Sequence, residues 1–221
     1  YDLVIQALSG FMAITGAKDS PPSKVGVAVT DILTALFSVI GILAELVQRP
    51  KFSEDAASFK QIDVSLMHCA MASMVNVGQS VLMSGEEAKR WGNAHSQIVP
   101  YESFETQDRT LVIAVGNDQQ FNRLCGLLER QDLALSSEYL TNDLRVANRE
   151  ALIPQLKQAM KAYPCSDLMV LLEREEIPFA PVNSLKEALH SKWAQANNLI
   201  FELPGGGQQI SSPLSPSFGI R

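Results

Sequence analysis

Asp31 stands directly after Thr30 and ahead of residues 32–44, a long apolar run without a charge. We predict that it opens a helix. An aspartate in this position most often caps the helix, which contributes about 1 kcal/mol. The positive end of a helix dipole also favours an ionised carboxylate, and the small neighbours Gly26 and Ala28 leave room for a ligand. Because an ionised carboxylate can attack an acyl group, Asp31 is our candidate catalytic residue.

A second candidate is the polar loop of residues 92–97, which contains Gly92, Asn93 and His95. A histidine in a loop is usually a surface residue. A loop of small residues can also present backbone N–H groups to a thioester oxygen, as an oxyanion hole does. We therefore take these three as candidate substrate-binding residues, with a plain surface loop as the alternative.

Other groups are explained without a function. Gly205–Gly207 lacks the Lys-Ser/Thr pair and the strand–helix context of a phosphate loop, so a hairpin turn is expected. Lys89 and Arg90 are expected to form a solvated helix end, with contact to an anionic ligand as the less favoured alternative. His68 and His190 fall in helical stretches, where packing or surface roles suffice.

The composition is that of an ordinary globular chain, with 46% of its 221 residues hydrophobic and 19% charged. The net charge of -6 and the lack of a dense Lys/Arg cluster argue against a nucleic-acid partner. Cys69, Cys125 and Cys165 are widely spaced, which favours neither a zinc site nor a disulfide framework. We expect no metal site, and a reducing compartment is the default.

The apolar spacing predicts two parts with a boundary near residues 90–98. The N-terminal part is predicted to hold helices over residues 3–15, 31–48 and 66–83. The uncharged run of the second helix is shorter than the roughly 20 residues of a membrane span, which favours a buried core helix and no membrane contact. The third helix carries four methionines that are expected to pack in the core, Met67, Met71, Met74 and Met83.

Beyond the boundary the predicted elements are shorter. They are a strand over residues 110–115, helices over 118–128, 147–163 and 166–175, an extended segment over 177–182 and a strand-like tail from Leu199. Ser166 is the expected N-cap of the last helix.

The chain begins at Tyr1 rather than at a methionine, and its first residues read as the middle of an element. No signal peptide is recognisable. We expect a longer protein with further residues ahead of Tyr1, where any targeting segment would lie. The expected location is the cytoplasm or the mitochondrial matrix.

Several stretches, taken in order, resemble the family III CoA-transferases. Among them are YDLVIQALSG at residues 1–10, GVAVTD at 26–31, QIDVSL at 61–66, EAKRWGNAH at 87–95, IVPY at 98–101, GNDQQF at 116–121 and IPFAPV at 177–182. No single stretch is decisive, but the ordered series is specific and runs from residue 1 to about 218.

The resemblance implies a two-domain α/β fold and an interlocked homodimer. Residues 1–90 would be part of the large domain with the helix of Asp31, residues 98–185 the small domain, and residues 186–221 a return segment toward the large domain. It also implies that a Rossmann-like N-terminal part is missing from this chain.

The resemblance further implies the chemistry. Asp31 would attack the thioester of an acyl-CoA, and CoA would pass through a covalent aspartyl-CoA intermediate. A CoA thioester is then a substrate, and no cofactor is tightly bound. The loop of residues 92–97 looks like the family's mobile segment over the active site. Residues 87–101 look most like the type that uses succinyl-CoA and a dicarboxylate such as glutarate or hydroxymethylglutarate.

Related α-methylacyl-CoA racemases have an acid/base histidine where this chain has Tyr1, which is thus a candidate substrate contact. A phenol titrates near pH 10 and suits α-proton exchange poorly, so transfer is favoured over racemisation. A racemase-like enzyme and a non-catalytic truncated homologue are the alternatives. The chain departs from the family pattern at residues 55–60 and at Asp108-Arg109, both expected to be surface changes.

Overall fold

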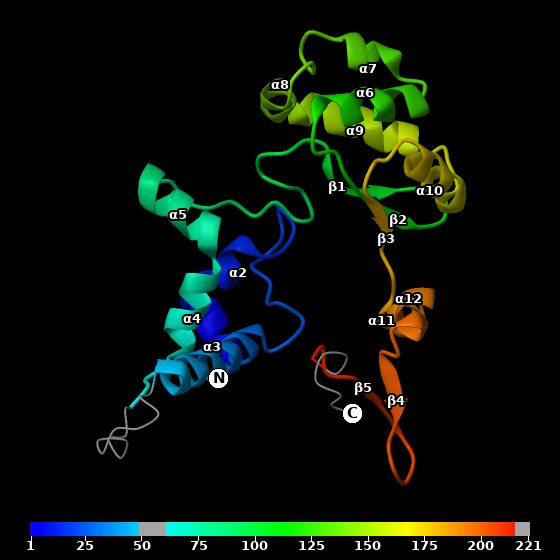
Figure 1. Ribbon diagram of the computed structural model, residues 1–221. Helices are drawn as coiled ribbons and strands as arrows, with labels where there is room; N and C mark the ends of the chain where they lie inside the picture. The colour runs from blue at the N-terminus through cyan, green and yellow to red at the C-terminus, as the bar shows by residue number, and fades with distance from the viewer. Residues whose placement is uncertain (49–60, 215–221) are drawn as a thin grey trace. The chain divides into compact units, whose positions relative to one another are not determined.

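The computed structural model describes residues 1–48 and 61–214 and divides the chain into two compact units, Tyr1–Ser96 and Gln97–Arg221 (Figure 1). The surface change expected at residues 55–60 lies outside the described residues. The assignment of the two units to the large and small domains of the family stays a prediction.

The described part of the first unit consists of helices. They are α1 (Asp2–Leu8), α2 (Phe11–Ile14), α3 (Val29–Gln48), α4 (Leu66–Ser73) and α5 (Val75–Ser84). The single helix predicted over residues 3–15 is two helices, because Gly10 adopts a φ of 92° and so interrupts the helical backbone. Helix α3 packs against α1 and α4.

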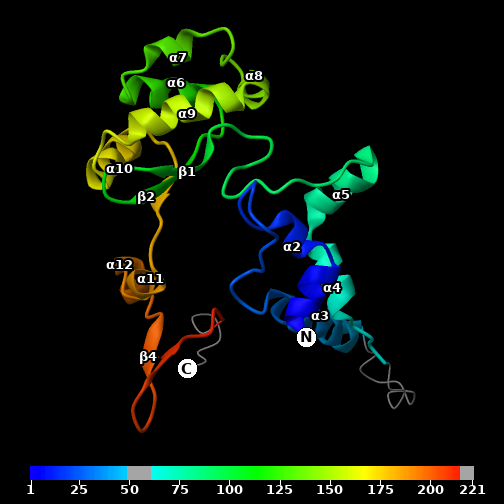
Figure 2. The ribbon, with the colours of Figure 1, turned by 180° about the vertical axis from the view of Figure 1, so that it is seen from behind.

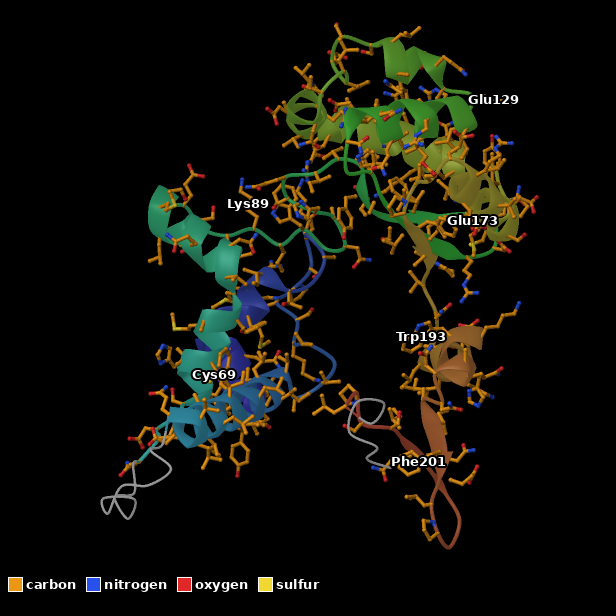
Figure 3. All side chains as sticks on the ribbon, viewed as in Figure 1. Cys69, Lys89, Glu129, Glu173, Trp193 and Phe201 are labelled. Carbon is orange, nitrogen blue, oxygen red and sulfur yellow. The ribbon has the colours of Figure 1, made fainter. Side chains whose placement is uncertain are left out.

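The segment predicted as one methionine-lined helix bends by 80° between α4 and α5. Ser65 caps α4 by accepting a hydrogen bond from the His68 N–H at 3.1 Å. The bend moves α5 away from the direction of α4, so the methionine stripe does not stay on one packed face. The prediction of a methionine core is wrong for Met71 and Met83, which are exposed. The buried side chains of α4 are instead those of Cys69, labelled in Figure 3, and Ala70.

Helix α3 contradicts the expectation of a buried core helix. Its 20 residues include a window with a mean hydropathy of 1.9, long and apolar enough by length and composition to cross a membrane, and only 6% of that window is buried in the described structure. The uncharged run was too short for a membrane span, but the helix itself is longer than that run, because it continues past Glu45 to Gln48. Apolarity predicts that a surface is covered, but it does not say which part of a protein covers it.

The second unit contains a three-stranded antiparallel sheet in the order β1-β2-β3, formed by Tyr101–Glu105, Thr110–Ala114 and Phe179–Pro181. Its larger helices are α6 (Asp118–Leu127), α9 (Arg149–Met160) and α10 (Cys165–Arg174), joined by the short α7 (Gln131–Leu135) and α8 (Asn142–Ala147). Helix α9 contacts β1, and α10 contacts β3 and α6, so the helices cover the sheet (Figures 1 and 2).

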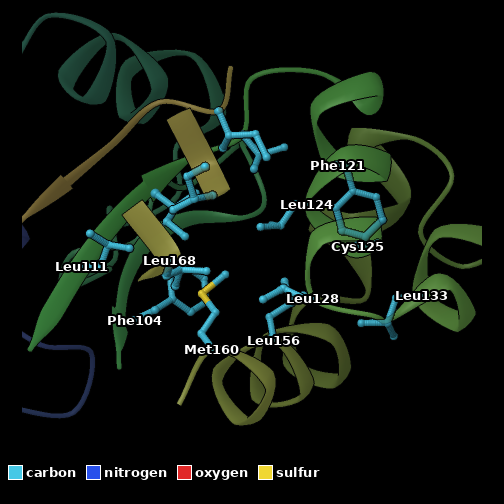
Figure 4. Close-up of a cluster of buried hydrophobic side chains, with 14 of the residues drawn as sticks. Phe104, Leu111, Phe121, Leu124, Cys125, Leu128, Leu133, Leu156, Met160 and Leu168 are labelled. Carbon is cyan, nitrogen blue, oxygen red and sulfur yellow. The ribbon is translucent and has the colours of Figure 1, made fainter. Parts of the chain in front are cut away.

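The core of this unit lies between the sheet and these helices (Figure 4). Strand β2 alternates buried and half-buried residues, and thereby directs Leu111 inward. Leu111 belongs to the same buried cluster as Phe121 of α6, Leu156 of α9 and Leu168 of α10. The two-period pattern of the strand and the helical spacing of the apolar residues together explain this packing.

The chain then forms α11 (Leu185–Leu189), α12 (Lys192–Ala196) and a hairpin of β4 (Ile200–Glu202) and β5 (Gln208–Ile210). The predicted hairpin turn at Gly205–Gly207 is confirmed, and all three glycines have a positive φ of 94–97°. The helical stretch expected around His190 is α11, which has His190 as its C-cap, whereas α12 was not predicted.

The Asp108-Arg109 pair is not a neutral surface change. Asp108 Oδ1 accepts a hydrogen bond from the Cys165 N–H at 2.8 Å, so it caps α10, which begins one residue before the expected cap Ser166. Arg109 Nη2 donates to Asn183 Oδ1 at 2.7 Å. It also pairs with Glu187 of α11 at 3.1 Å. The pair therefore fixes α10 and α11 to the end of the β1–β2 hairpin.

Candidate functional site

Asp31 lies in the first turn of α3, as predicted from its sequence context, and its side chain is exposed. The first helical hydrogen bond runs from the Ile32 N–H to the Ala28 carbonyl at 3.1 Å. Asp31 is thus one of the first-turn residues whose N–H groups have no acceptor within the helix. An exposed carboxylate at the positive end of a helix is accessible to a substrate and favourably placed as an anion.

The residue before Asp31 is held from outside its helix. Thr30 is fully buried, and its N–H and its hydroxyl both donate to Asp2 Oδ1, at 2.9 Å and 2.8 Å. Asp2 belongs to α1, so a carboxylate of one helix caps the N-terminus of another. The Thr30 carbonyl in turn accepts from the Thr34 hydroxyl at 2.7 Å, one turn further along α3.

The second oxygen of Asp2 is also occupied. Gln6 Nε2 donates to Asp2 Oδ2 at 2.7 Å, and Gln6 Oε1 accepts from the Val25 N–H at 2.9 Å. Partial desolvation alone would raise the pKa of Asp2, but the hydrogen bonds from Thr30 and Gln6, with the charge of Lys24, hold that pKa below its ordinary value. Asp2 is therefore an ionised acceptor at neutral pH.

The start of the candidate loop and the residues just before it are fixed to α2 and to the segment that follows α2. The Gly92 N–H donates to the Gly16 carbonyl at 3.1 Å, and Arg90 Nη1 donates to the Ala13 carbonyl at 3.1 Å. Gly92 has a φ of 62°, a conformation that a glycine adopts without strain. The expected solvated helix end at Lys89 and Arg90 is wrong, because α5 ends at Ser84 and Lys89 lies on the coil that follows (Figure 3).

Tyr1, Asn93 and His95 complete the predicted set. Tyr1 precedes α1 and is fully exposed, Asn93 is exposed and His95 is half-buried. All five predicted site residues belong to the first unit. Residues 1–17 link them, because this segment contacts the start of α3 through Asp2 and the loop through Ala13 and Gly16.

The last residue of the loop, Gln97, and the residues after it are held within the second unit. Asn142 Nδ2 donates to the Gln97 carbonyl at 2.8 Å, and Asn142 Oδ1 accepts from the Val99 N–H at 3.1 Å. The fully buried Arg145 donates to the Val99 carbonyl at 2.7 Å. The segment after the loop is thus held by α8.

Among the described residues, no group of three or more His, Cys, Asp or Glu side chains is placed to hold a metal ion. The three cysteines, all of them described, are buried and unpaired. Burial raises the pKa of the Cys125 thiol to about 12, so this thiol is not a nucleophile at neutral pH.

The sequence indicates the place of Asp31 at the start of a helix, but it did not lead us to Asp2, Gln6 and Thr30, which hold that start. A signal was present, because Asp2 and Gln6 are four residues apart and therefore share a face of α1. Nothing in the local pattern, however, pairs that face with Thr30, 28 residues away from Asp2.

The chain belongs to CoA-transferase family III, whose family model matches residues 1–218. Among its relatives is the succinyl-CoA:glutarate CoA-transferase of Mus musculus, 38% identical over 92% of this chain and 46% of the relative. The succinate–glutarate CoA-transferase of Agrobacterium fabrum is 37% identical over 92% of this chain and 50% of the relative. The chain thus spans about half the length of the curated relatives it matches.

A solved structure gives the same result for the fold. The crystal structure of a CAIB/BAIF family protein from Brucella suis superposes with a TM-score of 0.81 at 35% identity, over 96% of this chain and 55% of that protein. The described chain is therefore a partial fold of this family, in which helices predominate and the sheets are small. The expected α/β class holds in this coarser form.

Proposed function

We propose that the protein containing this chain transfers CoA from an acyl-CoA to a small carboxylic acid, with Asp31 as the nucleophile. The observation that carries the proposal is the exposed Asp31 at the first turn of α3, in a chain that matches the family model over residues 1–218. Relatives that use succinyl-CoA and a dicarboxylate support succinyl-CoA as the donor and a dicarboxylate as the acceptor.

The chemistry follows from a carboxylate nucleophile. Asp31 attacks the thioester carbonyl, which forms an acyl–aspartyl anhydride and releases CoA thiolate. The thiolate attacks the aspartyl carbonyl, which frees the donor acid and leaves an aspartyl-CoA thioester. The acceptor carboxylate then attacks this thioester, and the thiolate released attacks the acceptor's carbonyl in the new anhydride. The products are the new acyl-CoA and the free Asp31 carboxylate, so the cycle needs neither a metal nor a tightly bound cofactor.

The loop of residues 92–97 is proposed to contact the acyl-CoA through Gly92, Asn93 and His95, with Tyr1 as a further contact. We also propose that the protein is an interlocked homodimer. The exposed apolar residues of α3 support a covered surface there in the whole protein, because an apolar face of this size is rarely left to water. The cytoplasm or the mitochondrial matrix stays the proposed location.

The test is trapping of the intermediate. The intact protein is incubated with succinyl-CoA, quenched with hydroxylamine or borohydride, and analysed by mass spectrometry with peptide mapping. The expected result is a modification at Asp31 that is absent in Asp31→Asn, together with loss of turnover in that variant. Unchanged turnover in Asp31→Asn, with no adduct from any of several acyl-CoAs, would leave Asp31 as an ordinary first-turn residue of α3 and remove this function.

A further inference from the structure

Three hydrogen bonds converge on Asp2, and with a fourth bond, from Val25 to Gln6, they form a continuous chain of donors and acceptors at the start of α3. The chain runs from the Val25 N–H through the Gln6 amide to Asp2, and from Asp2 to Thr30. Gln6 and Thr30 are fully buried, and Asp2 and Val25 are half-buried. The two ends of the chain, Val25 and Thr30, bracket the turn that leads into Asp31.

The polarity of this chain is fixed at every step. The Val25 N–H can only donate, so Gln6 must present Oε1 to it and Nε2 to Asp2. The Thr30 N–H can also only donate, so Asp2 must accept there as well. The side chain at position 2 must therefore accept hydrogen bonds with both of its terminal atoms. A carboxylate can do this, whereas an amide has only one acceptor atom.

We propose that Asp2 is a positioning residue for Asp31 and, together with Gln6, fixes the direction in which the nucleophilic carboxylate leaves the helix. This inference rests on the function proposed above. Asp2 binds both the backbone and the side chain of Thr30, so it fixes the residue that immediately precedes Asp31. A carboxylate that must meet a thioester carbonyl at about 3 Å loses about 100-fold in rate when misplaced by about 1 Å.

The effect of a positioning residue differs from that of a substrate contact. A misdirected Asp31 still faces bound acyl-CoA but reacts more slowly, so kcat falls while KM stays near its original value. Loss of a substrate contact would instead raise KM. Loss of stability alone would change the fraction of folded protein without changing the rate of the folded molecules.

Because each donor and acceptor in this chain is fixed, three variants of the intact protein test the role of Asp2. Asp2→Asn places an amide N–H against the Nε2 of Gln6. Gln6→Glu places a second carboxylate oxygen against Oδ2 of Asp2. The double variant Asp2→Asn/Gln6→Glu restores every bond, because the new amide donates to the new carboxylate, which still accepts from Val25. It also keeps the net charge of the pair.

We expect each single variant to lower kcat and the single-turnover rate of Asp31 trapping by about 10- to 100-fold, with KM for the acyl-CoA changed by less than about 3-fold. The double variant is expected to recover to within about 5-fold of the original rate. Asp108→Asn is the matched control, because Asp108 also caps a helix through a backbone N–H but lies in the second unit. It should keep kcat.

Three results would overturn the proposal: single variants with unchanged kcat, a double variant no faster than the single ones, or a rise in KM at constant kcat. Rates are referred to folded protein, measured by circular dichroism and melting temperature, so a misfolded single variant leaves the double variant as the deciding measurement. Failure of the proposed function is distinct, because Asp31→Asn would then retain turnover whatever the Asp2 variants do.

Discussion

Replacing Arg145 with methionine is expected to destabilise the second unit more than any single surface substitution. The guanidinium is fully buried and donates to the carbonyls of Val99 at 2.7 Å and Tyr139 at 3.0 Å. It pairs with Asp118 at 2.8 Å and lies 4.5 Å from the centre of the Phe121 ring. Methionine retains much of the side-chain volume but can make none of these polar contacts.

The magnitude follows from the burial of each partner. Two hydrogen bonds from a charged donor to carbonyls contribute about 1.5–3 kcal/mol each. The ion pair adds less than about 1 kcal/mol, because the Asp118 side chain is 51% exposed. The ring contact adds about 0.5–2 kcal/mol. These contributions overlap, so we expect a loss of about 3–5 kcal/mol, or about 10–20 °C in melting temperature for a unit of this size.

Hydrogen exchange of the intact protein, combined with urea unfolding, measures this loss. Amide protection should fall in peptides that contain Val99 and Tyr139, and the unfolding midpoint of the second unit should move to lower urea. Arg174→Met is the control, since Arg174 is 70% exposed and pairs only with its neighbour Glu175 among the described contacts. If Arg145→Met costs no more than Arg174→Met, the buried bonds do not contribute as argued.

Three further expectations concern the same unit. Arg109→Met should increase exchange in α11 at a cost below about 1 kcal/mol, because its ion pair with Glu187 is partly exposed, and unchanged exchange there would contradict the clamp. The hydrogen bond from the Cys165 N–H holds the pKa of Asp108 below its ordinary value. Asp108 therefore stabilises the fold above about pH 4 and loses this effect as the pH falls through its lowered pKa, so urea midpoints of the original protein and Asp108→Asn should converge in acid. Burial raises the pKa of Cys125 to about 12, so iodoacetamide at pH 8 should label this thiol only after denaturation, as peptide mapping would show.

Local signals in the sequence predicted the elements that depend on neighbouring residues. Helix α6 begins where Asn117 accepts from the Gln120 N–H, a contact three residues long that capping rules describe. The strand over residues 110–115 and the glycine turn of the last hairpin were found for the same reason. Asp31 belongs to this group, since its place at the start of an apolar run defines the first turn of α3.

The errors have a common physical cause. The burial of α3 was inferred from its apolar content, but burial depends on what surrounds a helix. In the described structure α3 packs against α1 and α4, and only 6% of its apolar window is buried. The family match adds that the chain spans about half of its relatives. Met71 and Met83 are exposed, so the four methionines do not form one packed stripe; an 80° bend separates α4 from α5, and a positive φ of 36° at Val75 marks that bend.

The candidate site thus consists of Asp31, whose place at a helix start the local sequence pattern indicates, and of the residues that hold this helix start, which only the fold reveals. The bonds that hold the start of α3 join residues 19 and 28 positions apart, and the bond that holds the segment after the loop joins residues 46 apart. Each of these hydrogen bonds involves a polar side chain that, from the sequence alone, could equally well lie on the surface. What distinguishes Asp2 is that both of its oxygens meet donors of fixed polarity, and this is why a pair of exchanged substitutions, rather than a single deletion, tests its role.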